Sequence, residues 1–177
     1  MKYYISDLHF GHENIIRLCN RPFKNVREMD ETLIKNWNSV IKPEDEVYIL
    51  GDLIFRASKA PADYFSKLNG KKYLIKGNHD KINYQWKPYF EWIKDYAEIE
   101  DNGRRVILSH YPMVEWNAFF RGSIHLYGHI HNNKENNSYK IMRNIDNAYN
   151  VGADIIEFTP QTLDNIIHYN EVFNKEV

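Results

Sequence analysis

Cysteine, charge of one sign and long apolar runs are all scarce in this sequence. Cys19 is the only cysteine among the 177 residues, which excludes an internal disulfide and a cysteine-based structural zinc site. The formal net charge is −1, so no overall field draws the chain to nucleic acid or anionic lipid, although a local basic patch is not excluded. No run approaches the roughly 20 apolar residues that span a bilayer, and the first residues carry no secretory signal pattern, so we expect a cytoplasmic protein.

The remaining composition is that of an ordinary folded domain. Hydrophobic residues make up 43% of the chain and charged residues 27%, which is typical of globular proteins and excludes a disordered or fibrous chain. A length of 177 residues suits a single domain with a substantial core. We therefore expect residues 1–177 to form one domain.

Apolar runs alternate with helical patterns through the first half of the chain. The expected strands are residues 1–6, 46–50 and 72–75, and the expected helices are residues 13–18, 26–37 and 61–68. A β-α-β-α-β order implies parallel strands joined by right-handed crossovers.

The second half follows a different pattern, with strands close together in the sequence. Residues 92–99 and 104–108 are expected to form a hairpin through Asn102-Gly103, which is a strong turn signal. The other expected elements are a helix at 82–90 interrupted by Pro88, strands at 123–127, 139–142, 148–151 and 155–158, and a last helix at 161–173. The fold class predicted from both halves is α/β, with two packed mixed β-sheets flanked by helices.

Five of the apolar strands are followed at once by Asp, Asn or His. Asp52 is the clearest case, because it comes directly after Gly51 at the end of the apolar run 48–50. Open α/β sheets place their chemistry at the carboxyl ends of their strands, so we expect these side chains to lie together. They are Asp7 and His9 after the first strand, Asp52 after the second, Asn78, His79 and Asp80 after the third, His110 after the fourth, and His129 and His131 after the fifth.

Most of these side chains are metal ligands by type. Carboxylates and neutral imidazoles bind Mn, Fe, Zn or Ni, and the lack of thiolates argues against a structural zinc site. The candidate ligands are Asp7, His9, Asp52, Asn78, His110, His129 and His131. Seven ligands are too many for one open catalytic ion and suit two ions that share a carboxylate, which can together hold the attacking and leaving oxygens of a phosphoryl displacement. His125 and His168 are expected to be ordinary core or surface residues.

Taken in chain order, these motifs resemble the five motifs of the calcineurin-like metallophosphoesterases. The motifs are Asp7-x-His9, Gly51-Asp52, Gly77-Asn78-His79-Asp80, Ser109-His110 and Gly128-His129-x-His131. The chain looks most like the short, cap-less bacterial and phage members, with Asn150-Val151-Gly152 after the metal motifs as in many of them. The resemblance implies a metallophosphoesterase-like αββα sandwich.

The resemblance also implies a role for each residue. Asp7, His9, Asp52 and His131 would hold the first ion, and Asp52, Asn78, His110 and His129 the second, so that Asp52 bridges them. His79, oriented by Asp80, would protonate the leaving oxygen or stabilise the phosphoryl oxygens while a hydroxide between the ions attacks in line. The implied cofactors are two divalent ions, Mn first, with Fe, Zn or Ni as alternatives.

Side chains beyond the metal motifs should contact the substrate phosphate. We name His12 and Arg21, because both follow closely on the first motif. Arg56 and Arg121 are further candidates, since an arginine can bind phosphate through two parallel hydrogen bonds.

The predicted function is a metal-dependent phosphoesterase that hydrolyses phosphodiester or phosphomonoester bonds of small, nucleotide-like substrates. Two alternatives stay open: a nuclease, which would need a basic groove with stacking aromatics, and a non-catalytic scaffold, against which the complete ligand set and His79 argue. A protein serine/threonine phosphatase is disfavoured, because residues 53–56 lack that family's Asp-Arg-Gly and Asp80 replaces its Glu. The expected partner is a small phosphorylated molecule; we expect no membrane partner, and nucleic acid is the less favoured ligand.

Overall fold

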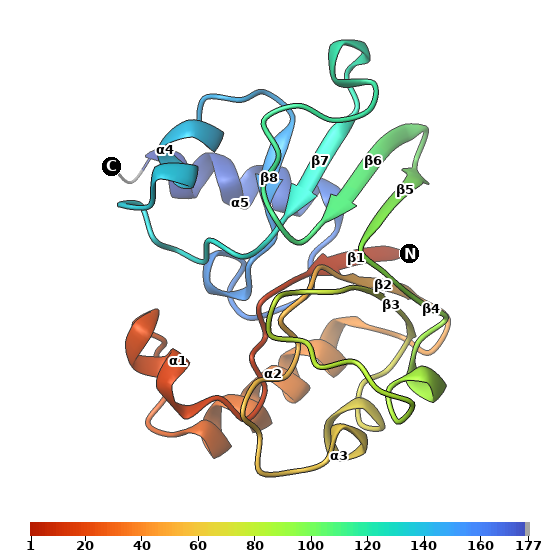
Figure 1. The fold of residues 1–177 in the computed structure, drawn as a ribbon, viewed down its shortest axis with the longest axis vertical. Helices are drawn as coiled ribbons and strands as arrows, with labels where there is room; N and C mark the ends of the chain where they lie inside the picture. Colours follow the sequence, from red (N-terminus) through yellow and green to blue (C-terminus); the bar gives the residue numbers. More distant parts are fainter. Residues whose placement is uncertain (176–177) are drawn as a thin grey trace.

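Two β-sheets lie face to face at the centre of the molecule (Figure 1). The structure is a computed structural model that describes residues 1–175. The first sheet has the strand order β1-β2-β3-β4, and all of its pairings are parallel. Its strands are β1 (Lys2–Ile5), β2 (Glu46–Ile49), β3 (Lys71–Ile75) and β4 (Trp92–Lys94).

The second sheet is mixed and has the order β5-β6-β7-β8. Its strands are β5 (Tyr96–Asp101), β6 (Arg104–Ser109), β7 (Ile124–Tyr127) and β8 (Ala148–Asn150). Strands β5 and β6 form the antiparallel hairpin predicted from Asn102-Gly103, and the other two pairings are parallel.

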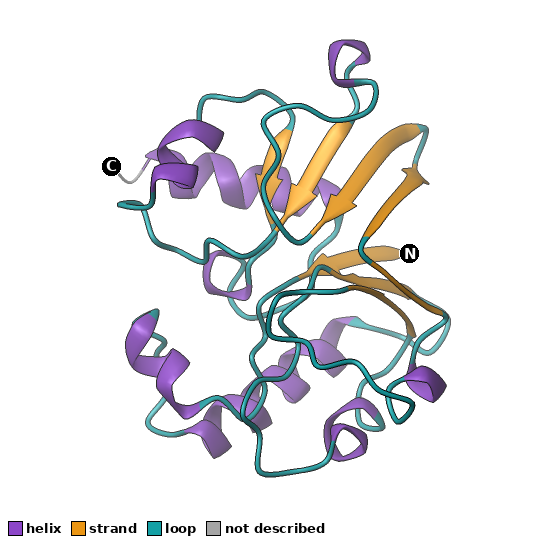
Figure 2. Ribbon diagram, viewed as in Figure 1, coloured by secondary structure: helices purple, strands orange, loops and turns teal. Residues whose placement is uncertain are grey.

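Helices cover the outer faces of both sheets (Figure 2). Helices α1 (Glu13–Leu18), α2 (Val26–Val40) and α3 (Pro61–Phe65) lie below the first sheet in this view, and α4 (Asn137–Met142) and α5 (Leu163–Lys175) lie beside the second. No helix within residues 1–175 is long and apolar enough to cross a bilayer.

Helix α2 shows why the helices pack where they do. The Asn25 side chain caps the helix by accepting a hydrogen bond from the backbone N–H of Glu28 at 2.9 Å. Met29, Leu33 and Trp37 recur at helical spacing and are fully or almost fully buried in the core below the first sheet. This core holds the strands of the first sheet in place from below.

The strands of the first sheet are apolar on both faces. Ile5 and Ile49 point into the core shared with the helices, whereas Tyr4 and Tyr48 join the core between the sheets. Leu108 contributes to this second core from β6. Burial on both faces explains why these strands are continuous apolar runs in the sequence.

The predicted α/β class with two packed, helix-flanked sheets is confirmed, and so is the parallel β-α-β-α-β order of the first half. The first sheet is purely parallel rather than mixed. The strand expected at 92–99 divides at Asp95 into β4 and β5, which belong to different sheets. Asp95 therefore joins the two sheets.

Three predicted elements of the second half are wrong. The helix expected at 82–90 is reduced to a 3₁₀ turn at Lys87–Tyr89, because Pro88 interrupts a longer helix. The strand expected at 139–142 is helix α4, whose first turn is capped by Asn136 and whose buried side chains recur at helical spacing. The strand expected at 155–158 is a turn with left-handed backbone at residues 157 and 158.

Candidate metal centre

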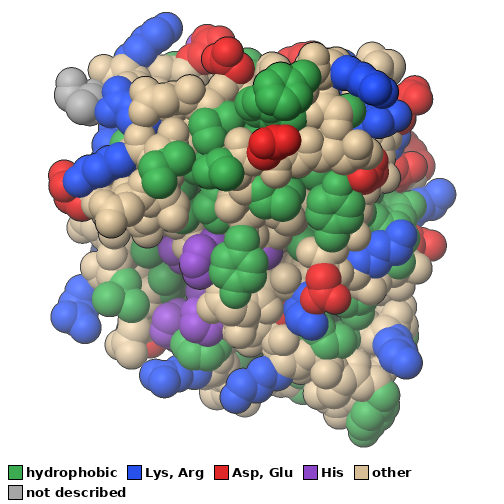
Figure 3. All heavy atoms as spheres, turned by 45° about the horizontal axis from the view of Figure 1, so that its top comes forward, with side chains coloured by type: hydrophobic (Ala, Val, Ile, Leu, Met, Phe, Trp, Pro, Cys, Tyr) green, Lys and Arg blue, Asp and Glu red, His purple; other side chains and the backbone are tan. Residues whose placement is uncertain are grey.

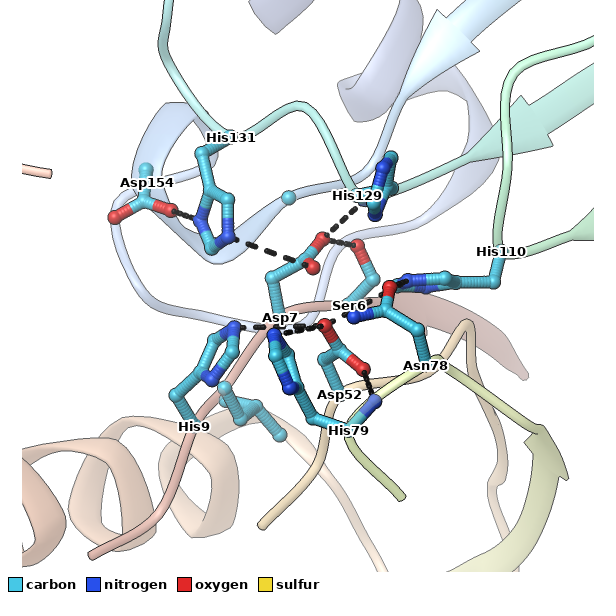
Figure 4. A network of polar contacts seen from close by, with 12 residues as sticks. Ser6, Asp7, His9, Asp52, Asn78, His79, His110, His129, His131 and Asp154 are labelled. Carbon is cyan, nitrogen blue, oxygen red and sulfur yellow. Dashed lines mark hydrogen bonds and ion pairs between the residues drawn. The ribbon is translucent and has the colours of Figure 1, made fainter. Parts of the chain in front are cut away.

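The predicted ligands lie together at one edge of the two sheets (Figure 4). Asp7, Asp52 and Asn78 follow the strands β1, β2 and β3 of the first sheet. His110 and His129 follow β6 and β7 of the second sheet. The carboxyl ends of these parallel strands meet at this edge, as expected for an α/β fold. The site is therefore assembled from both sheets.

The backbone is left-handed at five of the seven predicted ligands. The φ angles are 56° at Asp7, 53° at His9, 53° at Asp52, 71° at His129 and 51° at His131. Residues other than glycine rarely adopt this conformation, which costs about 1–3 kcal/mol at each position and is concentrated at functional sites. The surrounding structure therefore holds the ligand turns in a strained form that directs the side chains toward one another.

Two glycines allow the ligand turns to approach closely. A Cβ atom on Gly77 would collide with Oδ1 of Asp52, and one on Gly128 would collide with Oγ of Ser6 and lie 2.5 Å from Oδ2 of Asp7. Both positions therefore require glycine for a packing reason.

The first group of ligand atoms comes from Asp7, His9 and His131, and all three atoms lie within 4.8 Å of one another. Oδ2 of Asp7 accepts hydrogen bonds from Ser6 Oγ at 2.5 Å and from the backbone N–H of His129 at 2.9 Å. Oδ1 of Asp7 and both ring nitrogens of His9 are buried without a hydrogen-bond partner. Buried polar atoms in native proteins are nearly always satisfied, so this donor set fits a divalent cation.

The second group comes from Asp52, His110 and His129, again within 4.8 Å. Nδ1 of His110 lies 2.8 Å from the carbonyl oxygen of Leu50. Because a carbonyl only accepts, Nδ1 carries the hydrogen and Nε2 presents its lone pair to the centre. Oδ1 of the Asn78 side chain, which is also an acceptor, lies 3.0 Å from Nε2. These residues also fit a cation.

Asp52 lies between the two groups. Its Oδ2 is 3.7 Å from Nε2 of His9 and 3.6 Å from Nε2 of His110. These separations are too long for hydrogen bonds but suit atoms that share an ion, since two ligands about 2.1 Å from one ion can be up to about 4 Å apart. The position agrees with the predicted bridging role of Asp52.

Electrostatics favours the neutral form of two imidazoles at this edge. Burial lowers the pKa of His9 well below its ordinary value, with a further contribution from the nearby His131. Burial also lowers the pKa of His129, and His110 adds to the effect. Burial raises the pKa of the Asp52 carboxyl, although His110 acts in the opposite direction. Neutral imidazoles and buried carboxylates are the forms that a bound cation stabilises.

His79 lies over the centre from the first sheet (Figure 4). Its side chain is 36% exposed, and its Nε2 is 3.9 Å from Oδ2 of Asp52. The ring packs against Phe55 with a centroid distance of 4.1 Å. His79 is thus the exposed imidazole of the third motif, at the border between the ligands and solvent.

Asp80 does not contact the His79 ring, so the predicted orienting contact is wrong. The Asp80 carboxylate accepts hydrogen bonds of 2.9 Å from the backbone N–H groups of Asp52, Leu53 and Gly77. Burial raises its pKa to about 6, while the hydrogen bonds from Gly77 and Leu53 act to lower it. Asp80 therefore fixes the turns that carry Asp52 and Asn78 instead of orienting an imidazole.

An open cleft of about 860 Å³ extends from the candidate centre. His12 is 7% exposed, lies in its wall and packs edge-on against Phe55, and Nδ1 of its ring has no hydrogen-bond partner. Arg56 is exposed in the same cleft, whereas Arg121 lies outside its lining. Figure 3 shows histidine side chains gathered in one surface region beside hydrophobic ones. The placement of His12 is compatible with its predicted substrate contact.

The prediction that Arg21 contacts substrate is wrong. Its side chain is completely buried and forms an ion pair with Asp154 at 2.8 Å. It also donates hydrogen bonds to the carbonyl oxygens of Asp7 and Leu8 and to Sδ of Met29, and it lies over the ring of Phe158. The guanidinium is therefore occupied by the protein behind the ligand turns and has no surface toward the cleft.

Asp154 is a further residue of the site that was not predicted from the sequence. Its carboxylate accepts a hydrogen bond of 2.7 Å from Nδ1 of His131, whose Nε2 is 3.8 Å from Oδ1 of Asp7. Burial acts to lower the pKa of His131, but Asp154 and Asp7 raise it to about 11, so a cation would have to displace a proton there. Asp154 lies two residues after the Asn150-Val151-Gly152 motif, and this proximity was the only signal for it in the sequence.

The fold and the site together define an α/β protein with a candidate centre for divalent ions. The chain belongs to the calcineurin-like phosphoesterase family, whose sequence model matches residues 3–133. The predicted resemblance is thereby confirmed.

The similarity to known proteins extends over most of the chain. The uncharacterized protein MJ1445 of Methanocaldococcus jannaschii is 41% identical over 167 residues, covering 93% of this chain and 88% of that protein. The gene 66 protein of Mycobacterium phage L5 is 32% identical over 159 residues, covering 73% of this chain and 76% of that protein. The crystal structure of AQ665, a protein of unknown function from Aquifex aeolicus, has a TM-score of 0.75 and 32% identity, covering 95% of this chain and 98% of that one.

Proposed function

We propose that this protein is a metal-dependent hydrolase that cleaves phosphodiester or phosphomonoester bonds of small, nucleotide-like substrates with two divalent ions. The observation that carries the proposal is that Oδ1 of Asp7 and both ring nitrogens of His9 are buried without a hydrogen-bond partner, beside a second ligand group. The proposed ligands are Asp7, His9, Asp52 and His131 for one ion and Asp52, Asn78, His110 and His129 for the other. Membership of a phosphoesterase family supports hydrolysis as the reaction class.

When bound, the ions would supply positive charge for the phosphoryl oxygens and acidify the attacking water. Manganese is the first candidate, and iron, zinc or nickel are alternatives with the same ligand preference. The protein's own contribution is to hold the ligands in place: Leu50 fixes the tautomer of His110, and Asp80 fixes the turn that carries Asp52.

His79 is the proposed proton donor. Its partly exposed ring can reach a substrate, and Phe55 holds the ring beside the centre. A proton donated from Nε2 to the leaving oxygen would contribute about 10²–10⁴-fold to the rate. Asp80 supports this role only through the backbone of the loop.

The cleft supports a small substrate. Beside His12 and Arg56, its lining includes the side-chain amides of an asparagine-rich segment at residues 132–136, which offer both hydrogen-bond donors and acceptors. A volume of about 860 Å³ is in the range of small-molecule sites. Together with the net charge of −1, these features favour a nucleotide-sized ligand over a polynucleotide.

The test is a hydrolysis screen of the manganese-loaded protein. The substrates are bis-p-nitrophenyl phosphate, p-nitrophenyl phosphate, cyclic nucleotides, dinucleoside polyphosphates and an oligonucleotide. We expect turnover of at least one small ester, loss of turnover with a chelator, and loss of turnover in His9→Ala. Salt-sensitive cleavage of the oligonucleotide alone would identify a nuclease. A protein that binds two ions and hydrolyses none of the substrates would contradict an enzymatic role.

A further inference from the structure

A buried ion pair lies directly behind the first group of ligand atoms. Nε of Arg21 donates to Oδ1 of Asp154 at 2.8 Å, and Nη2 donates to Oδ2 at 3.2 Å. The two side chains are 0% and 1% exposed. Paired hydrogen bonds of this kind fix the relative orientation of the guanidinium and the carboxylate. A buried ion pair is maintained only when its remaining donors and acceptors are also satisfied, so their partners are informative.

Two further N–H groups of Arg21 reach the turn that carries Asp7, and Nη1 also donates to Sδ of Met29 at 3.5 Å. Nη2 donates to the carbonyl oxygen of Asp7 at 2.7 Å, and Nη1 donates to that of Leu8 at 2.9 Å. This turn includes the left-handed backbone at Asp7, with φ of 56°. Arg21 therefore holds the strained conformation in which Oδ1 of Asp7 faces the centre.

The remaining acceptor capacity of Asp154 is used by a predicted ligand. Its Oδ2 accepts a hydrogen bond from Nδ1 of His131 at 2.7 Å, as Figure 4 shows. Because a carboxylate accepts, a ring hydrogen lies on Nδ1, and an ion bound between Nε2 and Asp7 would replace the proton on Nε2. Hydrogen bonds of this type set both the tautomer and the orientation of metal-binding histidines.

In the second ligand group, the orientation of a histidine ligand is fixed in a different way. There the tautomer of His110 is fixed by the backbone carbonyl of Leu50, and no additional side chain is required. In the first group, two of the three members depend on the ion pair: Asp7 through its carbonyl oxygen and His131 through Asp154.

We propose that Arg21 and Asp154 are positioning residues that set the affinity of the Asp7–His9–His131 group for its ion. This inference rests on the proposed function, because it assumes that the group binds an ion. Asp154 holds His131 in the tautomer and orientation that a ligand needs. Arg21 neutralises Asp154 and fixes the backbone of Asp7. Neither residue belongs to the Asp7–His9–His131 group or lines the cleft.

The test measures Mn²⁺ binding to the full chain by titration calorimetry and by equilibrium dialysis. Asp154→Asn keeps the size of the side chain and removes its charge. We expect affinity for one of the two ions to fall about 10–100-fold, as for other residues behind metal ligands, and affinity for the second ion to stay within about threefold. The matched control is Asp101→Asn, a buried carboxylate that accepts a hydrogen bond of 2.9 Å from the hydroxyl of Tyr4, and its ion affinities should equal those of the wild type.

A second variant separates positioning from folding. Arg21→Met combined with Asp154→Leu removes both charges, and replacing a buried pair with apolar side chains usually preserves the fold. Thermal unfolding without metal checks that the variant is folded. We expect it to lose affinity for the same single ion.

The two hypotheses fail in different ways. A wild type that binds two ions, with Asp154→Asn and the double variant folded and binding both ions within twofold of it, would overturn the positioning role alone. An equal loss of affinity for both ions in Asp154→Asn would also overturn it, because the substitution would then affect the whole centre and not the first ligand group alone. A wild type that binds no ion would overturn the proposed function, and the positioning role with it.

Discussion

The backbone N–H of His79 donates a hydrogen bond of 2.8 Å to Oδ1 of Asp52. The proposed proton donor and the proposed bridging ligand are thus joined through the main chain, while Oδ2 of Asp52 faces His9 and His110. Truncation of the His79 side chain leaves this hydrogen bond in place. The two roles can therefore be separated by mutation.

We expect His79→Ala to keep both ions and to lose mainly kcat, by about 10²–10⁴-fold for an ester with an alkyl or nucleoside leaving group. The loss should be smaller for p-nitrophenyl esters, because p-nitrophenolate leaves without a proton. His131→Ala is the comparison variant; it should lose metal and activity together and recover partly with added Mn²⁺. The measurements are the metal content of both variants and their kcat on both kinds of ester. Loss of an ion in His79→Ala, or equal losses on both esters, would rule out the proton-donor role.

Asp52→Asn should weaken the binding of both ions, because Oδ2 lies between the two ligand groups. Metal analysis after dialysis should show close to two Mn per wild-type chain and clearly fewer in the variant. The control is again Asp101→Asn, which should keep the wild-type content. A wild-type content near one ion that Asp52→Asn leaves unchanged would exclude a bridged pair.

His12→Ala should reduce kcat/KM by about 10–100-fold if the ring contacts the substrate phosphate, since a hydrogen bond to a charged group contributes about 1.5–3 kcal/mol. The ring lies in the cleft wall, and its Nδ1 is without a protein partner. His168→Ala, at an exposed position on α5, serves as the control and should match the wild type. Steady-state kinetics that change less than twofold in His12→Ala would remove His12 from the substrate site.

Gly77→Ala should disrupt the centre without any change of ligand, because the added Cβ would collide with Oδ1 of Asp52. We expect a loss of about 1–3 kcal/mol in the free energy of unfolding, typical of overpacking, and weaker binding of both ions. Gly103→Asn is the control, since a Cβ there meets no atom within 4 Å and asparagine tolerates left-handed backbone. Calorimetry measures ion binding and urea unfolding measures stability, and both should be reduced in Gly77→Ala but not in Gly103→Asn. Equal values for the two variants would show that the turn at Gly77 can relax to accept a Cβ atom.

His125 should make the protein less stable in mild acid. It is fully buried and accepts a hydrogen bond from the backbone N–H of Met113, and burial lowers its pKa from 6.5 to about 4. The unfolded chain therefore binds more protons between these values, so stability falls as the pH drops from about 6.5 to 4, by up to about 3 kcal/mol from this residue. The measurement is urea unfolding at several pH values in the wild type and in His125→Gln, which keeps an acceptor and does not titrate. If the free energy of unfolding of His125→Gln depended on pH in the same way as that of the wild type, this assignment would be contradicted. His168→Gln is the control, and its pH dependence should equal that of the wild type.

Local patterns predicted much of this molecule. Asp7, Asp52 and His110 could be found because each follows an apolar run that forms a strand, and the carboxyl ends of parallel strands meet. Helix α4 was missed because four residues are too few to separate a helical period from an alternating one, although Asn136 is a good cap.

The contacts behind the ligands could not be predicted in this way. Arg21 and Asp154 are 133 positions apart, and an isolated arginine near a metal motif has the same local appearance whether it faces substrate or the protein interior. Asp80 belongs to a recognisable motif, but whether its carboxylate meets an imidazole or backbone N–H groups depends on how three turns pack together.

The division of the ligands between the two sheets has a mechanical consequence. An ion held by Asp7 and His131, or by Asp52 and His129, would tie together residues that are 124 or 77 positions apart in the sequence, just as a covalent cross-link closes a long loop and restricts the unfolded chain. A protein whose only cysteine is Cys19 has no disulfide to do this. Its metal supply would then govern its lifetime in the cell as well as its chemistry, because each ion that binds only the folded chain adds to the free energy of unfolding.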